Sequence, residues 1–171
     1  MDDFSSRWIV AARLIDHPVK RARQRYVVNY RLMPTLKIGV EWNPGADEVG
    51  PLVNWLAMTE TRTRPALMLG TSSDRIGTPD GQAYFVTLSK GLGAIGRFPI
   101  AGYVGATHGT FEDETRPIAG VTADVANWLR TRVMYDGENT HAALETSVGR
   151  HDFGLLLIDG EYVGATWSVT F

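Results

Sequence analysis

The sequence predicts an all-β fold of about twelve antiparallel strands, with about ten to fourteen as the range. Polar and apolar residues alternate with a period of two over most of the chain, which is typical of strands with two different faces. The 18 glycines, with Asp-Gly, Asn-Pro-Gly and Pro-Asp-Gly clusters, divide the chain into segments of about ten residues. The 171 residues contain no linker or internal repeat, so we expect a single domain over 1–171.

The clearest hairpin covers 26–42, where apolar residues occupy the even positions while Arg31, Lys37 and Glu41 lie on the other face. A three-residue loop at 33–35 keeps both apolar sets on the same side. The same alternation along the chain predicts strands at 7–15, 23–32, 36–43, 52–60, 65–72, 82–89, 99–107, 117–125, 129–135, 140–148, 151–157 and 161–171.

The final hairpin turns at Ile158-Asp159-Gly160. A three-residue loop there, with the glycine in the left-handed conformation, places Leu155 opposite Val163 and aligns the apolar sets of both strands on one face. A two-residue Asp-Gly turn instead mixes polar and apolar neighbours, so we expect the three-residue loop.

The composition excludes several classes of protein. The chain has no Cys, which removes disulfides, thiolate metal sites and cysteine nucleophiles. The formal charge of -2 gives no global attraction to nucleic acid, and no run of about 18 apolar residues forms a transmembrane helix. Residues 1–6 lack the apolar core of a secretory signal, so we expect such a signal to be absent or already removed.

Ionic side chains gather on one face of the predicted strands. They form either the solvated face of a soluble sheet or the polar lumen of a membrane barrel, because the period alone does not choose between the two. The opposite face is apolar and carries large aromatics near strand ends, which membrane interfaces favour. We therefore expect the lumen to be lined by Arg7, Arg13, Arg25, Arg31, Lys37, Glu41, Asp124, Arg130, Arg132 and Glu145, and lipid to contact Trp8, Tyr30, Trp42, Trp55, Tyr84, Trp167 and Phe171.

The last eleven residues, Glu161-Tyr-Val-Gly-Ala-Thr-Trp-Ser-Val-Thr-Phe171, place apolar residues at alternate positions before a terminal Phe. This segment resembles the C-terminal insertion signal of bacterial outer-membrane β-barrels, and 30–42 resembles their tight periplasmic hairpins. The resemblance implies a single up-and-down antiparallel transmembrane β-barrel in the bacterial outer membrane. It also implies the lipid bilayer with its lipopolysaccharide, and the outer-membrane assembly machinery, as partners.

The predicted connections separate by charge. An up-and-down topology brings alternate connections to opposite ends of a barrel, and the longer set is extracellular by analogy with known barrels. The connections after odd-numbered strands carry twelve acidic residues against five basic ones, whereas the others carry mostly Arg and Lys. The acidic set is Asp16, Asp47, Glu48, Asp74, Asp80, Glu112, Asp113, Glu114, Asp136, Glu138, Asp159 and Glu161, and the basic residues among them are Lys20, Arg21, Arg23, Arg75 and Arg116.

No catalytic or metal-binding motif stands out in the sequence. His141, Glu145 and Ser147 share a face of one strand, but His141 and Ser147 are separated by ~20 Å along it and cannot form a catalytic set. The hydroxyl-rich loop at 70–81 is typical either of a site for a sugar or anion or of a self-hydrogen-bonded turn. We expect no enzyme activity, no cofactor and no metal.

The predicted lumen suggests a function. Its seven basic and three acidic residues leave four net positive charges, which favours anions. We therefore expect a small outer-membrane pore for polar or anionic solutes. Two alternatives stay open: a non-conducting barrel with a structural or surface-binding role, whose interior ion pairs and water fill, and a soluble lipocalin-like barrel that binds an apolar ligand.

Overall fold

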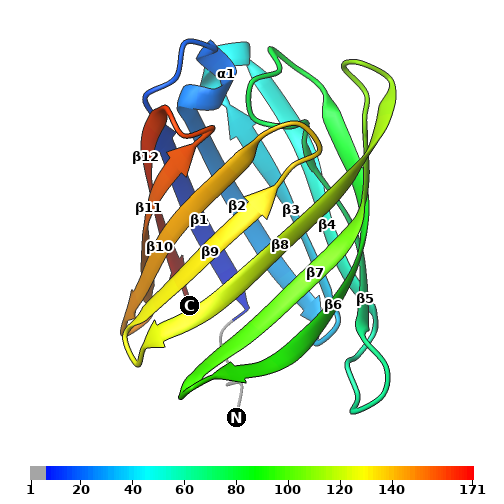
Figure 1. The fold of residues 1–171 in the computed structure, drawn as a ribbon. Coiled ribbons are helices and arrows are strands. Elements are labelled where there is room, and N and C mark those ends of the chain that lie inside the picture. Colours follow the sequence, from blue (N-terminus) through cyan, green and yellow to red (C-terminus); the bar gives the residue numbers. More distant parts are fainter. Residues whose placement is uncertain (1–6) are drawn as a thin grey trace.

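Twelve antiparallel strands close into a barrel in the computed structural model, which describes residues 7–171 (Figure 1). Each strand pairs with the next along the chain, and the last pairs with the first, so the expected up-and-down architecture and strand number are confirmed. The strands are β1 (Trp8–Ile15), β2 (Gln24–Met33), β3 (Leu36–Asn43), β4 (Glu48–Met58), β5 (Ala66–Ser73), β6 (Gln82–Ile95), β7 (Phe98–Gly109), β8 (Glu114–Ala126), β9 (Leu129–Tyr135), β10 (Thr140–Val148), β11 (His151–Ile158) and β12 (Tyr162–Thr170).

Backbone hydrogen bonds close the barrel between its first and last strands. The pairing runs from Ile9 opposite Thr170 to Ile15 opposite Gly164. Just beyond it, Trp8 and Phe171 exchange backbone N–H to carbonyl hydrogen bonds of 2.8 and 2.9 Å. Closure leaves neither of these strands with an unpaired edge, which removes the usual route to edge-to-edge aggregation.

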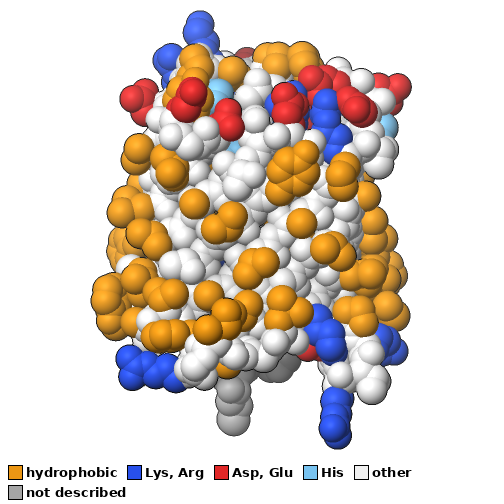
Figure 2. Space-filling view, in the orientation of Figure 1, with side chains coloured by type: hydrophobic (Ala, Val, Ile, Leu, Met, Phe, Trp, Pro, Cys, Tyr) orange, Lys and Arg blue, Asp and Glu red, His pale blue; other side chains and the backbone are white. Residues whose placement is uncertain are grey.

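The up-and-down order divides the connections between the two ends of the barrel. We call the end formed by the connections after odd-numbered strands the cap end; the other, where both chain termini lie, is the terminal end (Figure 1). Two short helices, α1 (Lys20–Arg23) and η1 (Pro44–Ala46), follow β1 and β3 at the cap end. Figure 2 shows the acidic side chains gathered at the cap end, mostly Lys and Arg at the terminal end, and hydrophobic side chains over the strands between them.

The register separates the two faces of every strand. In the hairpin of β2 and β3, Val28 pairs with Val40 and Tyr26 with Trp42 on the outer face, as the sequence predicts. On the outer face Val40 is 52% exposed, whereas Glu41, the next residue, points inward and is 1% exposed. The polar face of the sheet is therefore the inside of the barrel.

Three strand boundaries differ from the expected ones by more than two residues, among them the start of β8 at Glu114 rather than at residue 117. β4 begins at Glu48 rather than at residue 52, because the proline at its fourth position lies on the outer face and the strand continues through it. β6 and β7 extend to Ile95 and Phe98, so their hairpin is longer than predicted and absorbs a bulge between Gly91 and Gly93. The short helices are additions that the period-two pattern does not show.

The final hairpin has a three-residue loop, but the loop consists of residues 159–161. Asp159 and Gly160 both adopt positive φ angles of 54° and 70°. Leu155 therefore pairs with Ala165, and the predicted pairing of Leu155 with Val163 is wrong by two residues. A shift of two residues keeps each side chain on its face, so the expected apolar outer face is unchanged.

No helix within residues 7–171 has the length and apolar character that crossing a bilayer requires.

Candidate functional site in the barrel interior

A row of paired residues brings five of the interior charges together. Each residue in the row lies directly opposite the next on the neighbouring strand, so all their side chains share the inner face. The row runs from β8 to β2 as Asp124, Arg130, Glu145, Gly154, Thr166, Arg13 and Arg25. Charges of opposite sign alternate at one end of the row, whereas two arginines meet at the other.

Three of the interior arginines form ion pairs. Arg130 Nε donates to Asp124 Oδ1 at 2.6 Å, and Arg132 Nη2 donates to Glu145 Oε2 at 3.0 Å. Arg25 donates to Glu41 Oε2 from both Nε and Nη2. Because the Glu41 carboxylate is almost completely withdrawn from solvent, this last pair is the most deeply buried of the three.

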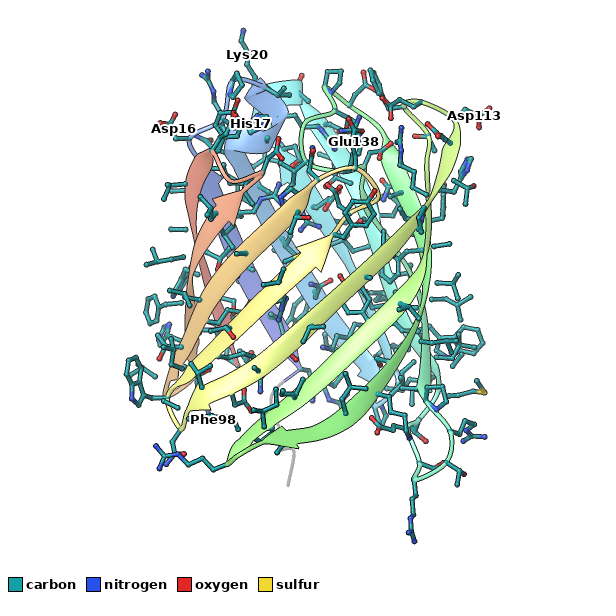
Figure 3. All side chains as sticks on the ribbon, in the orientation of Figure 1. Asp16, His17, Lys20, Phe98, Asp113 and Glu138 are labelled. Carbon is teal, nitrogen blue, oxygen red and sulfur yellow. The ribbon has the colours of Figure 1, made fainter. Side chains whose placement is uncertain are left out.

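A cavity of about 1030 Å³ occupies the part of the interior toward the terminal end. Arg13, Arg25 and Arg132 line it within the barrel, and Phe98 and Trp128 line it at the terminal-end connections. Figure 3 labels Phe98 at this end of the barrel. Its lining contains no residue of the cap-end connections, so the cavity lies toward the terminal end.

Two interior assignments change the predicted lumen charge. Arg7 is exposed just before β1 and donates to the Tyr30 hydroxyl at 3.2 Å, so it lies at the outer rim instead of in the lumen. Asp152, which the sequence analysis missed, accepts hydrogen bonds from the Ser147 and Ser168 hydroxyls on the inner face. Asp152 lies in a strand that is apolar on both faces, so the sequence pattern does not show which of its residues point inward. The register places Arg31 opposite Lys37 on the same inner face, nearer the terminal end.

The predicted set of lumen residues therefore has a smaller net charge than expected. With Arg7 removed and Asp152 added, six basic residues minus four acidic ones leave two positive charges, where the sequence analysis counted four. Glu48, Glu114 and Arg116 also occupy inner-face positions, but they lie at the cap end. The basic residues are Arg13, Arg25, Arg31, Lys37, Arg130 and Arg132, and the acidic residues are Glu41, Asp124, Glu145 and Asp152.

The predicted lipid-facing aromatics form two groups on the outer face. By their strand positions Trp8, Tyr30, Trp55 and Phe171 lie toward the terminal end, Trp42 and Tyr84 toward the cap end, and Trp167 in between. Six of the seven are 37 to 53% exposed, and Tyr30 is half-buried against Trp8, with ring centroids 4.9 Å apart. Trp128, which the analysis missed because it stands in a turn, is 67% exposed at the terminal end.

Arg21 fastens the cap end. Its guanidinium, 4% exposed, donates to the carbonyl oxygens of Asp74, Arg75 and Thr78 at 3.0, 2.9 and 2.8 Å, and to the Thr78 hydroxyl. Burial lowers the pKa of Arg21 below its usual range, although the nearby Glu48 carboxylate opposes this shift. The side chain thus joins the connection after β1 to the connection after β5 across the top of β3 and β4.

Contacts continue from Arg21 around the whole cap end. Asp74 Oδ2 accepts the Phe111 backbone N–H at 3.1 Å, and Arg75 pairs with Glu112 and Glu138 at 3.0 and 2.8 Å. The remaining links are Gly81 N–H to Glu48, Asp159 N–H to His141 Nδ1, and the tilted rings of His17 and Tyr162, whose centroids are 4.4 Å apart. Five of the six cap-end connections, together with Glu48 at the start of β4, take part in this set of contacts, which we call the cap network; Figure 3 labels its members His17 and Glu138.

The cap network also shows where two candidate sites of the sequence analysis lie, the loop at 70–81 and the set on β10. In the loop at 70–81, Asp74 and Thr78 are buried and bonded within the protein, so their polar groups are not presented to a ligand. His141 bonds Asp136 at 2.8 Å near the cap end while Ser147 bonds Asp152, so the suspected catalytic set is dispersed along β10. Within residues 7–171 no group of three or more metal-ligating side chains comes together.

Comparison with protein-family models, with curated proteins and with solved structures gave no match.

Proposed function

We propose that this protein is an outer-membrane β-barrel that acts as a gated pore for small polar solutes. The observation that carries the proposal is an apolar outer surface around a lumen that holds charged side chains and a cavity of about 1030 Å³. Twelve strands enclose more space than the eight that side chains alone can fill. The proposed surroundings are the bacterial outer membrane with its lipopolysaccharide, which the protein reaches through the assembly machinery.

The distribution of polarity supports a membrane barrel over a soluble one. A soluble lipocalin-like barrel keeps its apolar face inside, whereas here Arg25, Glu41 and Arg132 lie inside and large hydrophobic side chains cover the outside. Soluble monomers rarely expose continuous apolar patches of more than a few hundred Å². The aromatic side chains toward both ends of the strands match the interfacial belts of membrane proteins.

The cap network makes the pore a gated one. The cavity reaches the terminal end and its lining includes no cap-end connection, while Arg21 ties two connections together at the other end, so in this proposal the pore opens when the contacts of Arg21 break. This same observation favours the second candidate function, a non-conducting barrel whose cap stays closed and whose role is structural.

Single-channel recording in planar bilayers tests the proposal with two variants of α1. Arg21→Gln removes the charged donors that hold the loop carbonyls, and should raise the open probability or conductance at least about tenfold over the wild type. Lys20→Gln removes the same charge from an exposed neighbour in the same helix and should behave as the wild type.

Each result selects one of the two candidates. Conduction that Arg21→Gln increases and Lys20→Gln leaves unchanged supports the gated pore. If neither the wild type nor a correctly folded Arg21→Gln variant conducts, the pore is refuted and the structural barrel remains. With only two net positive charges in the lumen, the open pore should prefer anions weakly, and this preference should fade toward 1 M salt, where the Debye length is ~3 Å.

A further inference from the structure

Arg13 differs from the other arginines that line the cavity wall within the barrel. Arg25, Arg130 and Arg132 each have a carboxylate partner within 3.0 Å, whereas no described carboxylate lies within 4.0 Å of Arg13. Its Nε is shielded from solvent and makes no hydrogen bond to residues 7–171. Arg13 also lies directly opposite Arg25 on β2, so the register places two like charges side by side.

The wall beside Arg13 is made of small and hydroxyl-bearing residues. Thr166 is its neighbour on β12, and Gly154, which has no side chain, follows on β11. A Cβ on Gly154 would lie 2.4 Å from Thr166 Oγ1, which shows that the hydroxyl already fills the place of a side chain there. Thr166 Oγ1 itself donates to no described residue, and it lines the same cavity as Arg13.

We propose that Arg13 and Thr166 form a binding site for an oxyanion, a carboxylate or phosphate group on a small polar solute, at the inner end of the lumen cavity. The guanidinium supplies the charge and a planar set of N–H donors, and the threonine supplies a neutral hydroxyl donor beside it. An oxyanion there would give Arg13 the partner that the protein does not provide. It would also relieve the repulsion between Arg13 and Arg25.

The carboxylates around the cavity do not compete for this site. Glu41 is bonded to Arg25, Asp124 to Arg130 and Glu145 to Arg132, while Asp152 accepts two serine hydroxyls. Arg97 at the terminal end lines the cavity as well, so five arginines against these four carboxylates leave one net positive charge. Because Arg25, Arg130 and Arg132 each have a carboxylate of their own, the selectivity for an anion comes from the position of Arg13.

The cavity size fits a sugar acid or a sugar phosphate. A volume of about 1030 Å³ exceeds the lower range of small-molecule sites, about 300 Å³. The inference rests on the proposed function for the side from which the solute enters the cavity, which would be the periplasm. Binding of the solute itself requires no conduction.

Isothermal titration of the full chain, folded in detergent at low salt, tests the site. The probes are glucose 6-phosphate, gluconate and glucose, which share a carbon chain of similar size and differ in charge. The two anions should bind and glucose should not. Arg13→Gln should weaken the anions about tenfold or more, and Thr166→Val, which keeps the side-chain shape, about twofold to tenfold. Arg62→Gln, an exposed residue of the terminal end, removes the same charge and should change binding less than twofold.

Several outcomes overturn the proposal. These are the absence of anion binding by the wild type, glucose binding as tightly as its phosphate, and equal weakening by Arg13→Gln and Arg62→Gln. Arg13→Gln removes a repulsion and should fold, and Thr166→Val provides an independent test if it does not. Binding without conduction would keep this site and refute the pore, whereas conduction without binding would do the reverse.

Discussion

Single residues inside this barrel are defined by what lies opposite them in the sheet. Glu41 is the clearest example, because its buried carboxylate accepts hydrogen bonds from Nε and Nη2 of Arg25. Arg13 lies opposite Arg25 on the neighbouring strand. Removing the carboxylate leaves two adjacent arginines without a counter-charge. The structure therefore assigns Glu41 a role in holding the interior together.

Replacing Glu41 by Gln should destabilise the barrel by about 3 kcal/mol, because breaking a buried ion pair leaves an uncompensated charge. The measurement is the urea dependence of unfolding in lipid vesicles, followed by tryptophan fluorescence. Glu114→Gln is the control, since Glu114 is 57% exposed in its pair with Arg116, and exposed pairs contribute less than about 1 kcal/mol. Equal effects of the two substitutions would contradict the assigned role.

At the scale of elements, the cap-end connections differ in how they are held. The turn between β9 and β10 is fastened by Asp136, which accepts the backbone N–H groups of Glu138 and Asn139 and bonds the His141 ring. Burial alone would raise the pKa of Asp136, but these hydrogen bonds outweigh it, so the pKa lies below its ordinary value. The ionised carboxylate is therefore the form that supports the turn.

The stabilising effect of Asp136 should depend on pH. A carboxylate whose pKa is lowered by folding stabilises the protein fully above its unfolded pKa of about 3.9, and this contribution disappears as the pH falls through the lower folded value. The unfolding free energy of wild type minus Asp136→Asn should be about 1 to 2 kcal/mol at pH 7 and should shrink below about pH 4.

Asp47→Asn is the matched control for this pH series. Asp47 is an exposed cap-end carboxylate with a positive φ angle that asparagine also tolerates. A difference for Asp136→Asn that stays constant from pH 7 to pH 3 would show that the charge of Asp136 does not hold the turn.

At the scale of the whole molecule, an apolar belt lies between two ends of different charge (Figure 2). The belt includes the exposed Trp8, Trp42, Trp55 and Trp167, and Trp128 adds a fifth tryptophan at the terminal end. Tryptophan favours the interface between hydrocarbon and headgroups. The proposed membrane position therefore predicts that the tryptophan side chains lie at the depth of the bilayer interfaces, which quenching of their fluorescence can measure.

Vesicles of brominated lipids should quench that fluorescence by more than half, with the strongest effect for bromines close to the interfaces. Quenching requires close approach of bromine to an indole ring, which only a bilayer around the belt provides. The wild type should also need detergent or lipid to stay monodisperse. A folded barrel that stays monomeric in buffer and is protected from brominated lipid would favour the soluble alternative.

Among the expected features, the strands followed from local patterns. The alternation in 26–42 predicted a hairpin with the correct faces, because neighbouring side chains of a strand always point to opposite sides. The pairing of the final hairpin was displaced by two residues, since three-residue loops at 158–160 and at 159–161 satisfy the same alternation and only the αL backbone at Asp159 decides between them. Arg7 was misplaced because a strand end does not constrain its side chain as a strand interior does.

The sequence by itself determined the class of fold, about twelve strands, and which residues share a face, because these depend on period and on turn residues within short segments. Only the tertiary structure decided which charges become partners. Arg21 meets the carbonyls of a loop 53 to 57 residues away, and Arg13 meets Thr166 across the closure of the barrel. Such contacts are fixed by the stagger of strands around a closed sheet, a property of all twelve pairings together that no single segment contains.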